Sequence, residues 1–353
     1  MKVEIRQLNL MKLSPKDNQS INEVLANSVN ATVFHTIEWN QLLIKQFELQ
    51  NVTLLATKCE TTVGLYSFYK LDNHRCWSPA IHLQSVYGGP ISMRNDPQVV
   101  AELLREGERL QRFAAFQIWT PPNYDISPFV KLSYSLREMY TPVLNLQASE
   151  DELWARLHSE KRNRIRKAEK NDVLIIDGDS SNVDEYYEMV VATLSSTGIN
   201  ILPKSFYRAT LIHLKPQGMA RLMLAKYKGK FIAGTITLFY KDTAYFWDAG
   251  WHRDYGSLAP NDLLHWQVIK WANQNRYKYY DLLRLEADRL PGIARWKMKF
   301  GGDVMPCYYL SKATPGYRLR RGLKTITNPR RVLSKLRSFM VGRSVTKHEE
   351  NRG

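Results

Sequence analysis

The order of apolar and polar residues along the chain predicts two α/β segments. In the first segment, apolar positions at helical spacing predict a helix over 36–47. Two stretches of alternating residues, 51–58 and 62–71, are typical of half-buried strands. Pro97 then begins a helix with an apolar stripe, and a short strand at 116–120 ends the segment.

The second segment repeats this order. Residues 219–251 predict three strands joined by tight turns, followed by a loop, a helix over 261–275 and a strand over 277–283. Similar strings also recur, VGLYSFYK at 63–70 and AGTITLFYK at 233–241. Each segment therefore contains a hairpin, a strand, a loop marked by glycine or proline, a helix and a strand. We interpret them as two copies of one α/β unit.

Composition supports a two-domain protein. The chain has 353 residues, of which 44% are hydrophobic, and this is enough for two cores. We expect domains at 1–148 and 149–311, followed by a basic tail at 312–353. The start of the chain has no apolar run like that of a signal peptide, and no stretch approaches the roughly 18 apolar residues of a membrane span. Three scattered cysteines fit neither a disulfide framework nor a zinc site and favour a cytoplasmic protein.

The excess of positive charge is concentrated in two places. The chain has 50 Lys and Arg against 34 Asp and Glu. Residues 312–353 contain twelve basic and two acidic residues, and residues 156–170 contain seven and two. Such segments indicate contact with a polyanion, which we take to be a phosphate-bearing substrate, RNA or an anionic membrane.

The tail has its own helical pattern. After Pro329, apolar residues recur at helical spacing among Arg and Lys residues. A basic amphipathic helix suits the headgroup layer of an anionic membrane or an RNA backbone, and it also suits packing of the apolar stripe on the protein body. All three interpretations remain open, and the first would make the protein peripheral at the inner membrane face.

The repeated order of elements matches the GNAT acetyltransferase fold, in which a mixed sheet splays open between two parallel strands. We expect the splay between 243–251 and 278–283. The fold class is therefore α/β, with two fused GNAT-like units, mixed splayed sheets and a basic helical tail. The helix between the two strands presents its N-terminus to the splay, where unpaired N–H groups favour an anion.

The loop before that helix matches part of a coenzyme A site. Such a site has the pattern Arg/Gln-x-x-Gly-x-Gly/Ala, and Arg253 and Gly256 fit it. Leu258 replaces the second small residue, and Pro260 removes one N–H donor. A thioester donor and a simple strand-to-helix turn are both consistent with this loop.

Two further segments are candidates for chemistry. If the basic block around 158–173 is helical, Arg162, Arg166 and Lys170 form a positive row that a bound polyanion would neutralise, although a solvated charged face is the simpler interpretation. A short helix ending near Gly301 would place Lys297 in its last turn. That lysine interacts there with the helix dipole, or it faces a developing oxyanion.

Six segments together resemble the Fem-type peptidoglycan aminoacyltransferases, which consist of two fused acetyltransferase folds. In the family's order they are FHTIEWNQLL, VYGGPI, KRNRIRKAEKNDV, LAPNDLLHWQVIKWA, KYYDL and GIARWKMKFGG. The resemblance implies transfer of an amino acid from aminoacyl-tRNA to an amine of a cell-wall precursor peptide. It also implies that the precursor carries a nucleotide or lipid diphosphate. No cofactor or metal is expected.

The resemblance also implies roles for particular residues. Lys297, beside Trp296, falls on the lysine that the family uses to stabilise the tetrahedral intermediate. Arg162, Arg166 and Lys167 fall in the family's basic segment.

Other candidates come from the strands and the loop. Asp281 and Asp248, near the ends of the two splayed strands, are candidates for the base that deprotonates the amine, although capping or turn roles are the simpler explanation. We also expect substrate contacts from a further set of residues. They are Arg253, Gly256, Asn261 and Trp247.

Two other functions remain open at this stage. One is an acyl-CoA-dependent N-acyltransferase that acts on a cell-surface saccharide or amino-compound. The other is a non-catalytic protein of the same fold that binds RNA or membranes through its basic surfaces.

Overall fold

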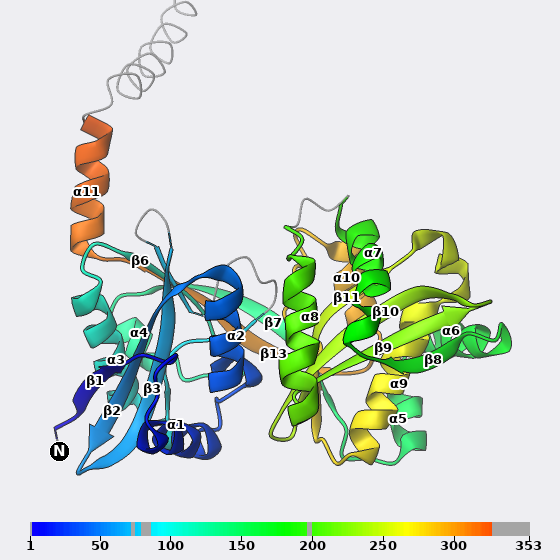
Figure 1. Ribbon diagram of the computed structural model, residues 1–353, viewed down its shortest axis with the longest axis horizontal. Coiled ribbons are helices and arrows are strands. Elements are labelled where there is room, and N and C mark those ends of the chain that lie inside the picture. The colour runs from blue at the N-terminus through cyan, green and yellow to red at the C-terminus, as the bar shows by residue number, and fades with distance from the viewer. Residues whose placement is uncertain (1, 72–74, 79–85, 196–199, 327–353) are drawn as a thin grey trace, which may run out of the picture.

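The computed structural model describes residues 2–71, 75–78, 86–195 and 200–326. Two α/β halves lie side by side and share one mixed sheet (Figure 1). The sheet order is β1-β2-β3-β4-β6-β13-β7-β12-β11-β10-β9-β8, with β5 paired to β3. This arrangement confirms the predicted fold of two GNAT-like units.

The first half runs from β1 to β7. Its elements are β1 (Glu4–Leu8), α1 (Pro15–Asn27), α2 (Ile37–Phe47), β2 (Gln50–Lys58), β3 (Thr61–Leu71), β4 (Arg75–Ser78), β5 (Ile91–Ser92), α3 (Pro97–Leu110), β6 (Ala115–Trp119), α4 (Ser127–Lys131) and β7 (Ser135–Asn145).

The second half begins with two additional helices. Its elements are α5 (Glu150–Arg156), α6 (Ser159–Lys170), β8 (Leu174–Gly178), α7 (Val183–Leu194), α8 (Lys204–Leu214), β9 (Ala220–Tyr227), β10 (Lys230–Tyr240), β11 (Thr243–Trp251), α9 (Pro260–Gln274), β12 (Tyr279–Asp281), α10 (Pro291–Met298) and β13 (Asp303–Ala313). After α6, the elements follow the order of the first half.

The last strands of the two halves are exchanged. β13 pairs antiparallel with β6 of the first half, and β7 pairs antiparallel with β12 of the second half. β7 and β13 also pair with each other from Ser135 to Val143. Each half therefore completes the sheet of the other, so the two halves are joined by backbone hydrogen bonds as well as by side chains.

Aromatic side chains fill the junction between the halves. Trp39 of α2 lies fully buried against Trp247 of β11, with ring centroids 5.5 Å apart, and against Phe206 of α8 at 5.9 Å. Edge-to-face pairs of this kind add to the stabilisation from buried area. α2 and α8, which are equivalent helices of the two halves, pack on each other here.

The predicted splay in the second half is present. β11 and β12 run parallel but pair only from Thr243–Tyr279 to Tyr245–Asp281. Beyond Tyr245, β11 continues to Trp251 along β10. Gly250 is essential for this geometry because a Cβ there would lie 2.3 Å from the backbone nitrogen of Val190 in α7.

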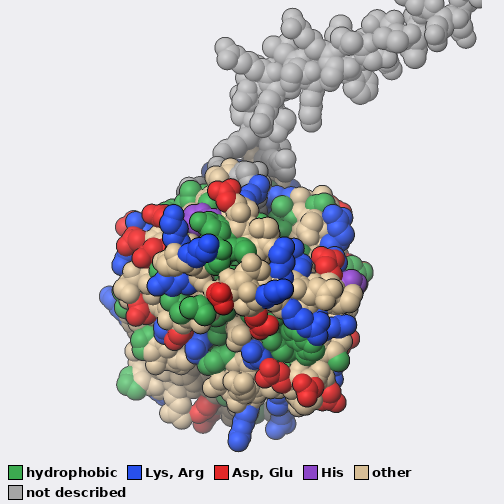
Figure 2. Space-filling model, turned by 90° about the vertical axis from the view of Figure 1, so that its right-hand side faces the viewer, with side chains coloured by type: hydrophobic (Ala, Val, Ile, Leu, Met, Phe, Trp, Pro, Cys, Tyr) green, Lys and Arg blue, Asp and Glu red, His purple; other side chains and the backbone are tan. Residues whose placement is uncertain are grey.

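The tail is described only in part. A helix, α11 (Pro315–Ile326), leaves the first half, and the predicted amphipathic helix after Pro329 lies outside the described residues. Within the described ranges, no helix has the length and apolar character needed to cross a bilayer. The face formed by the second half carries Lys and Arg mixed with acidic and apolar side chains (Figure 2).

Candidate active site

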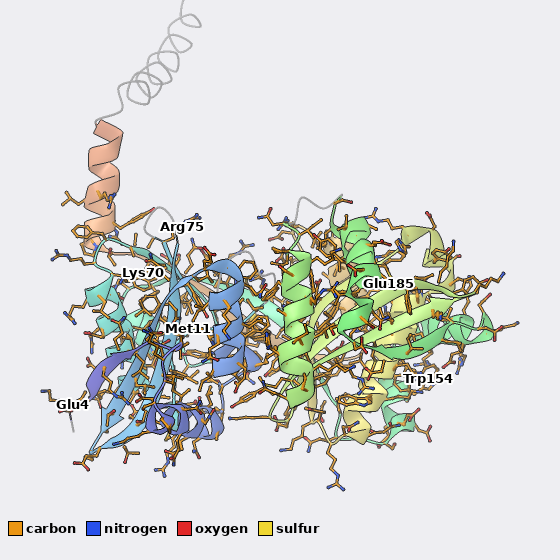
Figure 3. All side chains as sticks on the ribbon, viewed as in Figure 1. Glu4, Met11, Lys70, Arg75, Trp154 and Glu185 are labelled. Carbon is orange, nitrogen blue, oxygen red and sulfur yellow. The ribbon has the colours of Figure 1, made fainter. Side chains whose placement is uncertain are left out.

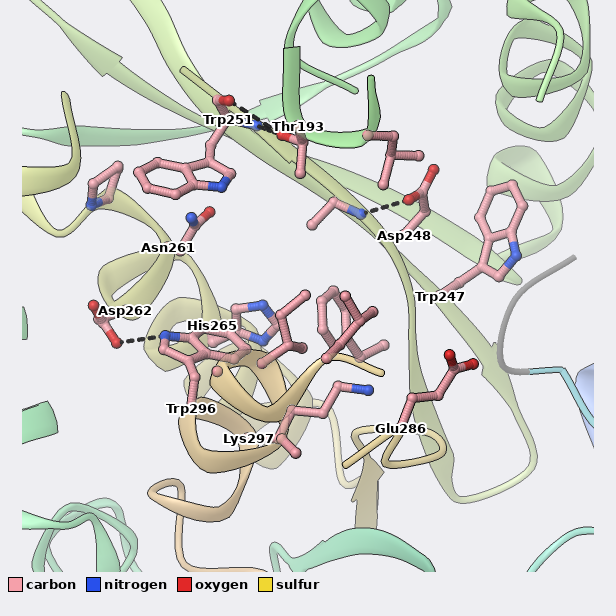
Figure 4. A pocket seen from close by; sticks show the side chains of 18 of the residues that line it. Thr193, Trp247, Asp248, Trp251, Asn261, Asp262, His265, Glu286, Trp296 and Lys297 are labelled. Atoms are coloured by element: carbon pink, nitrogen blue, oxygen red, sulfur yellow. Dashed lines mark hydrogen bonds between the residues drawn. The ribbon is translucent and has the colours of Figure 1, made fainter. Parts of the chain in front are cut away.

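A cavity of about 390 Å³ lies in the splay of the second half (Figure 4). Its wall is formed by the outer part of β11, the turn before α9, the first residues of α9, the segment after β12, and α10. Residues of α6, α7 and α8 and of the segment before α8 complete it. Aromatic and aliphatic side chains dominate this wall. They include Leu202, Tyr207, Phe246, Trp247, Trp251, Leu285, Leu290, Ile293 and Trp296.

Lys297 of α10 lines this cavity, and its side chain is 6% exposed. Its Nζ donates to the carbonyl oxygens of Leu283 at 3.2 Å and Arg284 at 3.1 Å. An ammonium has three donors, so one remains for a molecule in the cavity. Burial lowers the pKa of Lys297 to about 8, although the negative charge of Asp281 opposes this shift.

Asp281 lies behind Lys297 and is not among the residues that line the cavity. Its carboxylate accepts hydrogen bonds from the backbone N–H of Leu283 at 2.8 Å and from the hydroxyl groups of Thr141 and Tyr87. Burial raises its pKa, and these hydrogen bonds oppose the shift.

This carboxylate also stabilises an unusual backbone conformation. Leu283 has a φ of 55°, a left-handed conformation that is strained for a non-glycine residue. The hydrogen bond from its N–H to Asp281 holds the turn whose carbonyls accept from Lys297. Asp281 therefore contacts the turn that holds Lys297 but does not line the cavity, where a base for the incoming amine would be needed.

A buried ion pair supports the start of α9. Asp262 is completely buried and accepts hydrogen bonds from Lys161, from Arg164 Nε at 2.6 Å and from Trp296 Nε1 at 3.0 Å. The ammonium of Lys161 lies 4.1 Å from the ring centroid of Trp296 and 4.3 Å from that of Phe300. These contacts fix Trp296 beside the cavity.

The basic block is helical and forms α6, which meets the condition for a positive row, but Lys161 is its buried basic residue. Arg162 donates to the carbonyls of Ala155 and Leu157. Arg166 lies 5.3 Å from the ring centroid of Trp154, which is labelled in Figure 3. Lys167 is exposed. None of these three predicted residues lines the cavity, whereas Arg164 does.

Sequence reasoning missed Lys161, yet a signal was present. Ile165 and Ala168 are the apolar residues of this helix, and Lys161 precedes them at i–4 and i–7. It therefore belongs to the buried face.

Of the other residues predicted to contact substrate, some line the cavity and one does not. Trp247, Gly256, Asn261 and Trp296 line the cavity, and Arg253 does not. The structure also adds Arg284 and Glu286, which form an ion pair at 2.7 Å in the segment after β12.

Comparison with known proteins agrees with this architecture. Residues 155–298 match the family model for the acetyltransferase (GNAT) domain. A crystal structure of FemX is 13% identical, with coverage of 89% of this chain and 99% of FemX and a TM-score of 0.69. L-PGS from Bacillus licheniformis is 11% identical, with coverage of 88% and 96% and a TM-score of 0.55.

A tandem GNAT protein from the clavulanic acid biosynthesis pathway is 10% identical, with coverage of 89% and 99% and a TM-score of 0.57. No curated protein matched the sequence. The whole chain therefore has the fold class of a tandem GNAT protein, and its second half matches the model for the acetyltransferase (GNAT) domain. Within that class, the arrangement of the whole chain is Fem-like.

Proposed function

We propose that this protein is an aminoacyltransferase that moves an amino acid from aminoacyl-tRNA to an amine of a peptidoglycan precursor peptide. The observation that carries this proposal is the buried Lys297, which has a free donor facing an apolar cavity in the splay of a Fem-like fold. The sequence resemblance points to the same lysine.

The reaction requires positioning and charge stabilisation. The neutral amine attacks the carbonyl carbon of the ester, and a C–N bond forms while the carbonyl oxygen becomes an oxyanion. The C–O bond to the ribose then breaks, and the proton lost by the amine neutralises the departing ribose oxygen. Lys297 donates to the oxyanion, and one such donor typically contributes about 3–4 kcal/mol to the transition state.

The start of α9 favours an ester donor over acyl-CoA. In a coenzyme A site, N–H groups at this helix start would face the pyrophosphate. Here Pro260 has no N–H, and the carboxylate of Asp262 lies buried in the first turn. Asp262 already pairs with Lys161 and Arg164, so these two cations are engaged by the protein's own carboxylate and not by a pyrophosphate.

Acyl-CoA-dependent N-acyl transfer to a saccharide or amino-compound is the second candidate. Gly256 lines the cavity, and a Cβ at that position would meet the Trp251 ring at 3.1 Å. Packing against Trp251 therefore accounts for the glycine at position 256 without a bound coenzyme A. Arg253, the other matching residue, lies outside the cavity lining.

The proposed acceptor is a precursor linked to a nucleotide or lipid diphosphate, and a lipid-linked precursor would bring the protein to the inner membrane face. A further fold relative, the C-terminal domain of a putative lysylphosphatidylglycerol synthetase from Agrobacterium fabrum, suggests lipid as an alternative acceptor class. The basic sequence of α11 is compatible with that alternative.

A matrix of donors and acceptors tests the proposal. Full-length protein is incubated with charged tRNA or acyl-CoA, each with a nucleotide-linked precursor, a lipid-linked precursor or phosphatidylglycerol vesicles. We expect a mass increase of one amino-acid residue in a precursor, only with charged tRNA. Product from acyl-CoA alone would favour the second candidate. Binding of RNA or vesicles without any product would favour a non-catalytic function.

A further inference from the structure

Three basic and three acidic side chains line the cavity, and four of these six form ion pairs with each other. Arg164 pairs with Asp262 at 2.6 Å, and Arg284 pairs with Glu286 at 2.7 Å. The other two charged side chains are Lys297 and Asp248. Within the described part of the chain, neither has an oppositely charged group within 4 Å. One cation and one anion among the residues that line the cavity therefore lack an ion-pair partner within the described part of the chain.

Asp248 is held in a setting that lacks a cation. It lies on β11 between Trp247 and Ala249, across the cavity from Lys297 (Figure 4). Its Oδ1 accepts from the N–H of Ala249 at 2.9 Å. Its Oδ2 is buried and has no hydrogen bond of regular geometry, and the neighbouring phenols of Tyr207 and Tyr186 act on it as hydrogen-bonding groups that oppose the rise in its pKa.

A carboxylate in this setting is energetically unfavourable until a cation arrives. Burial of a charge without a partner is costly, and burial raises the pKa of Asp248 to about 6. Other groups facing the site do not supply the cation. Burial lowers the pKa of His265 well below its usual value, so this imidazole is neutral at pH 7.

We propose that Asp248 binds the α-ammonium group of the aminoacyl donor while Lys297 faces the donor's carbonyl oxygen. This assignment rests on the proposed function and deepens it. An aminoacyl ester carries one cation and one carbonyl, separated by a single carbon atom, and the cavity offers one partner for each. The aromatic wall formed by Trp247, Trp251 and Phe246 encloses the rest of the group.

According to this assignment, the protein distinguishes donors by whether they carry an α-ammonium group. A donor with a hydroxyl in place of the ammonium leaves Asp248 without its cation but keeps the same shape. Hydrogen bonds to charged groups contribute enough free energy that we expect this donor to bind roughly 10- to 100-fold more weakly. An uncharged acyl group has the same disadvantage.

Two small probes separate charge from shape. They are adenosine carrying alanine through a 3′-amide and the same compound carrying lactate, in which a hydroxyl replaces the ammonium. Binding to the full-length protein is followed by tryptophan fluorescence or calorimetry at pH 7.5. The alanyl probe should bind roughly 10- to 100-fold more tightly to the wild type, and Asp248→Asn should remove this preference. Asp254→Asn, at an exposed position outside the cavity lining, should retain it.

The comparison of the two probes on the wild-type protein needs no variant, so the proposal can be overturned even if Asp248→Asn folds poorly. Equal affinity for the two probes, or binding of neither at millimolar concentration, would overturn the proposal. A preference that persists in Asp248→Asn would also overturn it. A wild-type preference for the alanyl probe without any amide product in the donor–acceptor matrix would support ammonium binding while contradicting the transfer function.

Discussion

In both halves the central helix, α3 or α9, follows an equivalent pair of strands. The space at the start of this helix is nearly filled in the first half and forms the cavity in the second. In the first half, Gly64 and Leu65 of β3 pair with β5, and in the second half Gly234 and Thr235 of β10 pair with the outer end of β11. Each partner strand leads through a short 3₁₀ turn to a helix that begins with proline. The first-half position encloses only about 10 Å³, against about 390 Å³ in the second half.

The residue before the proline accounts for much of this difference. Asp96 caps α3 by accepting from the N–H groups of Gln98 and Val99, and it pairs with Lys58. The first half thus supplies its own anion at the helix start. Ala259 precedes α9 with a φ of 55° and provides no side-chain cap, so this helix start borders the cavity. The same position in the fold is therefore capped and filled in the first half and borders a cavity in the second half.

Removal of the carboxylate near each helix start should affect stability very differently. Asp262→Ala leaves Lys161 buried without its counterion, and loss of one partner of a buried pair costs about 3–5 kcal/mol. Asp96→Ala removes a helix cap on a partly exposed side chain and should cost about 1 kcal/mol. Urea denaturation of both variants measures the free energy of unfolding. Similar losses of unfolding free energy would show that the two carboxylates stabilise their helix starts equally.

Lys297→Met should produce the largest loss of turnover. In the second half, Lys297 lines the cavity and is the proposed oxyanion donor. Loss of one such donor lowers kcat about 100-fold or more. Lys299→Met is the matched control because Lys299 lies at the end of the same helix but pairs with Glu160. Rates are measured at saturating donor, with unfolding curves to verify folding. Near-normal turnover of Lys297→Met would remove the role assigned to this residue.

The pH dependence of transfer tests the two unpaired charges together. Asp248 has a raised pKa of about 6, so its negative charge is lost as the pH falls through 6. Lys297 has a lowered pKa of about 8, so its positive charge is lost as the pH rises through 8. We expect kcat/KM to fall about tenfold per pH unit below 6 and again above 8. Asp248→Asn should lose the acidic limb only, and an unchanged acidic limb in that variant would contradict the assignment.

Much of the fold could be predicted from the sequence because its signals are local. The hairpins, the helix after Pro97, the helix after Pro260 and the basic helix all follow from hydrophobic period and helix-start residues. The exchange of β7 and β13 could not be predicted, since strand pairing between distant segments leaves no local pattern. Lys297 came from family resemblance, and the pairing of Lys161 with Asp262 depends on contact between two helices far apart in sequence.

The first half reaches Asp281 of the second half through two hydroxyl groups, those of Thr141 and Tyr87, and substitution of Tyr87 tests this link. Tyr87 follows β4 in the first half, and its OH donates to Asp281 at 2.9 Å. Tyr87→Phe removes a buried hydrogen bond, which should cost about 1–3 kcal/mol of stability and loosen the turn at Leu283 that holds Lys297. We expect a severalfold loss of kcat with little change in KM. Loss of stability with normal kcat would restrict Tyr87 to a structural role.

Deletion of the tail should have the smallest effect on the chemistry. α11 begins at Pro315 in the first half, on the far side of the molecule from the cavity (Figure 1). A variant that ends at Thr314 should retain its rate with a nucleotide-linked acceptor to within about twofold, because no cavity residue is removed. Retention on anionic vesicles or RNA should weaken in a salt-dependent manner, since each cation near an anionic membrane contributes about 1 kcal/mol. Unchanged retention at low salt would show that the remaining surface of the two halves binds the polyanion.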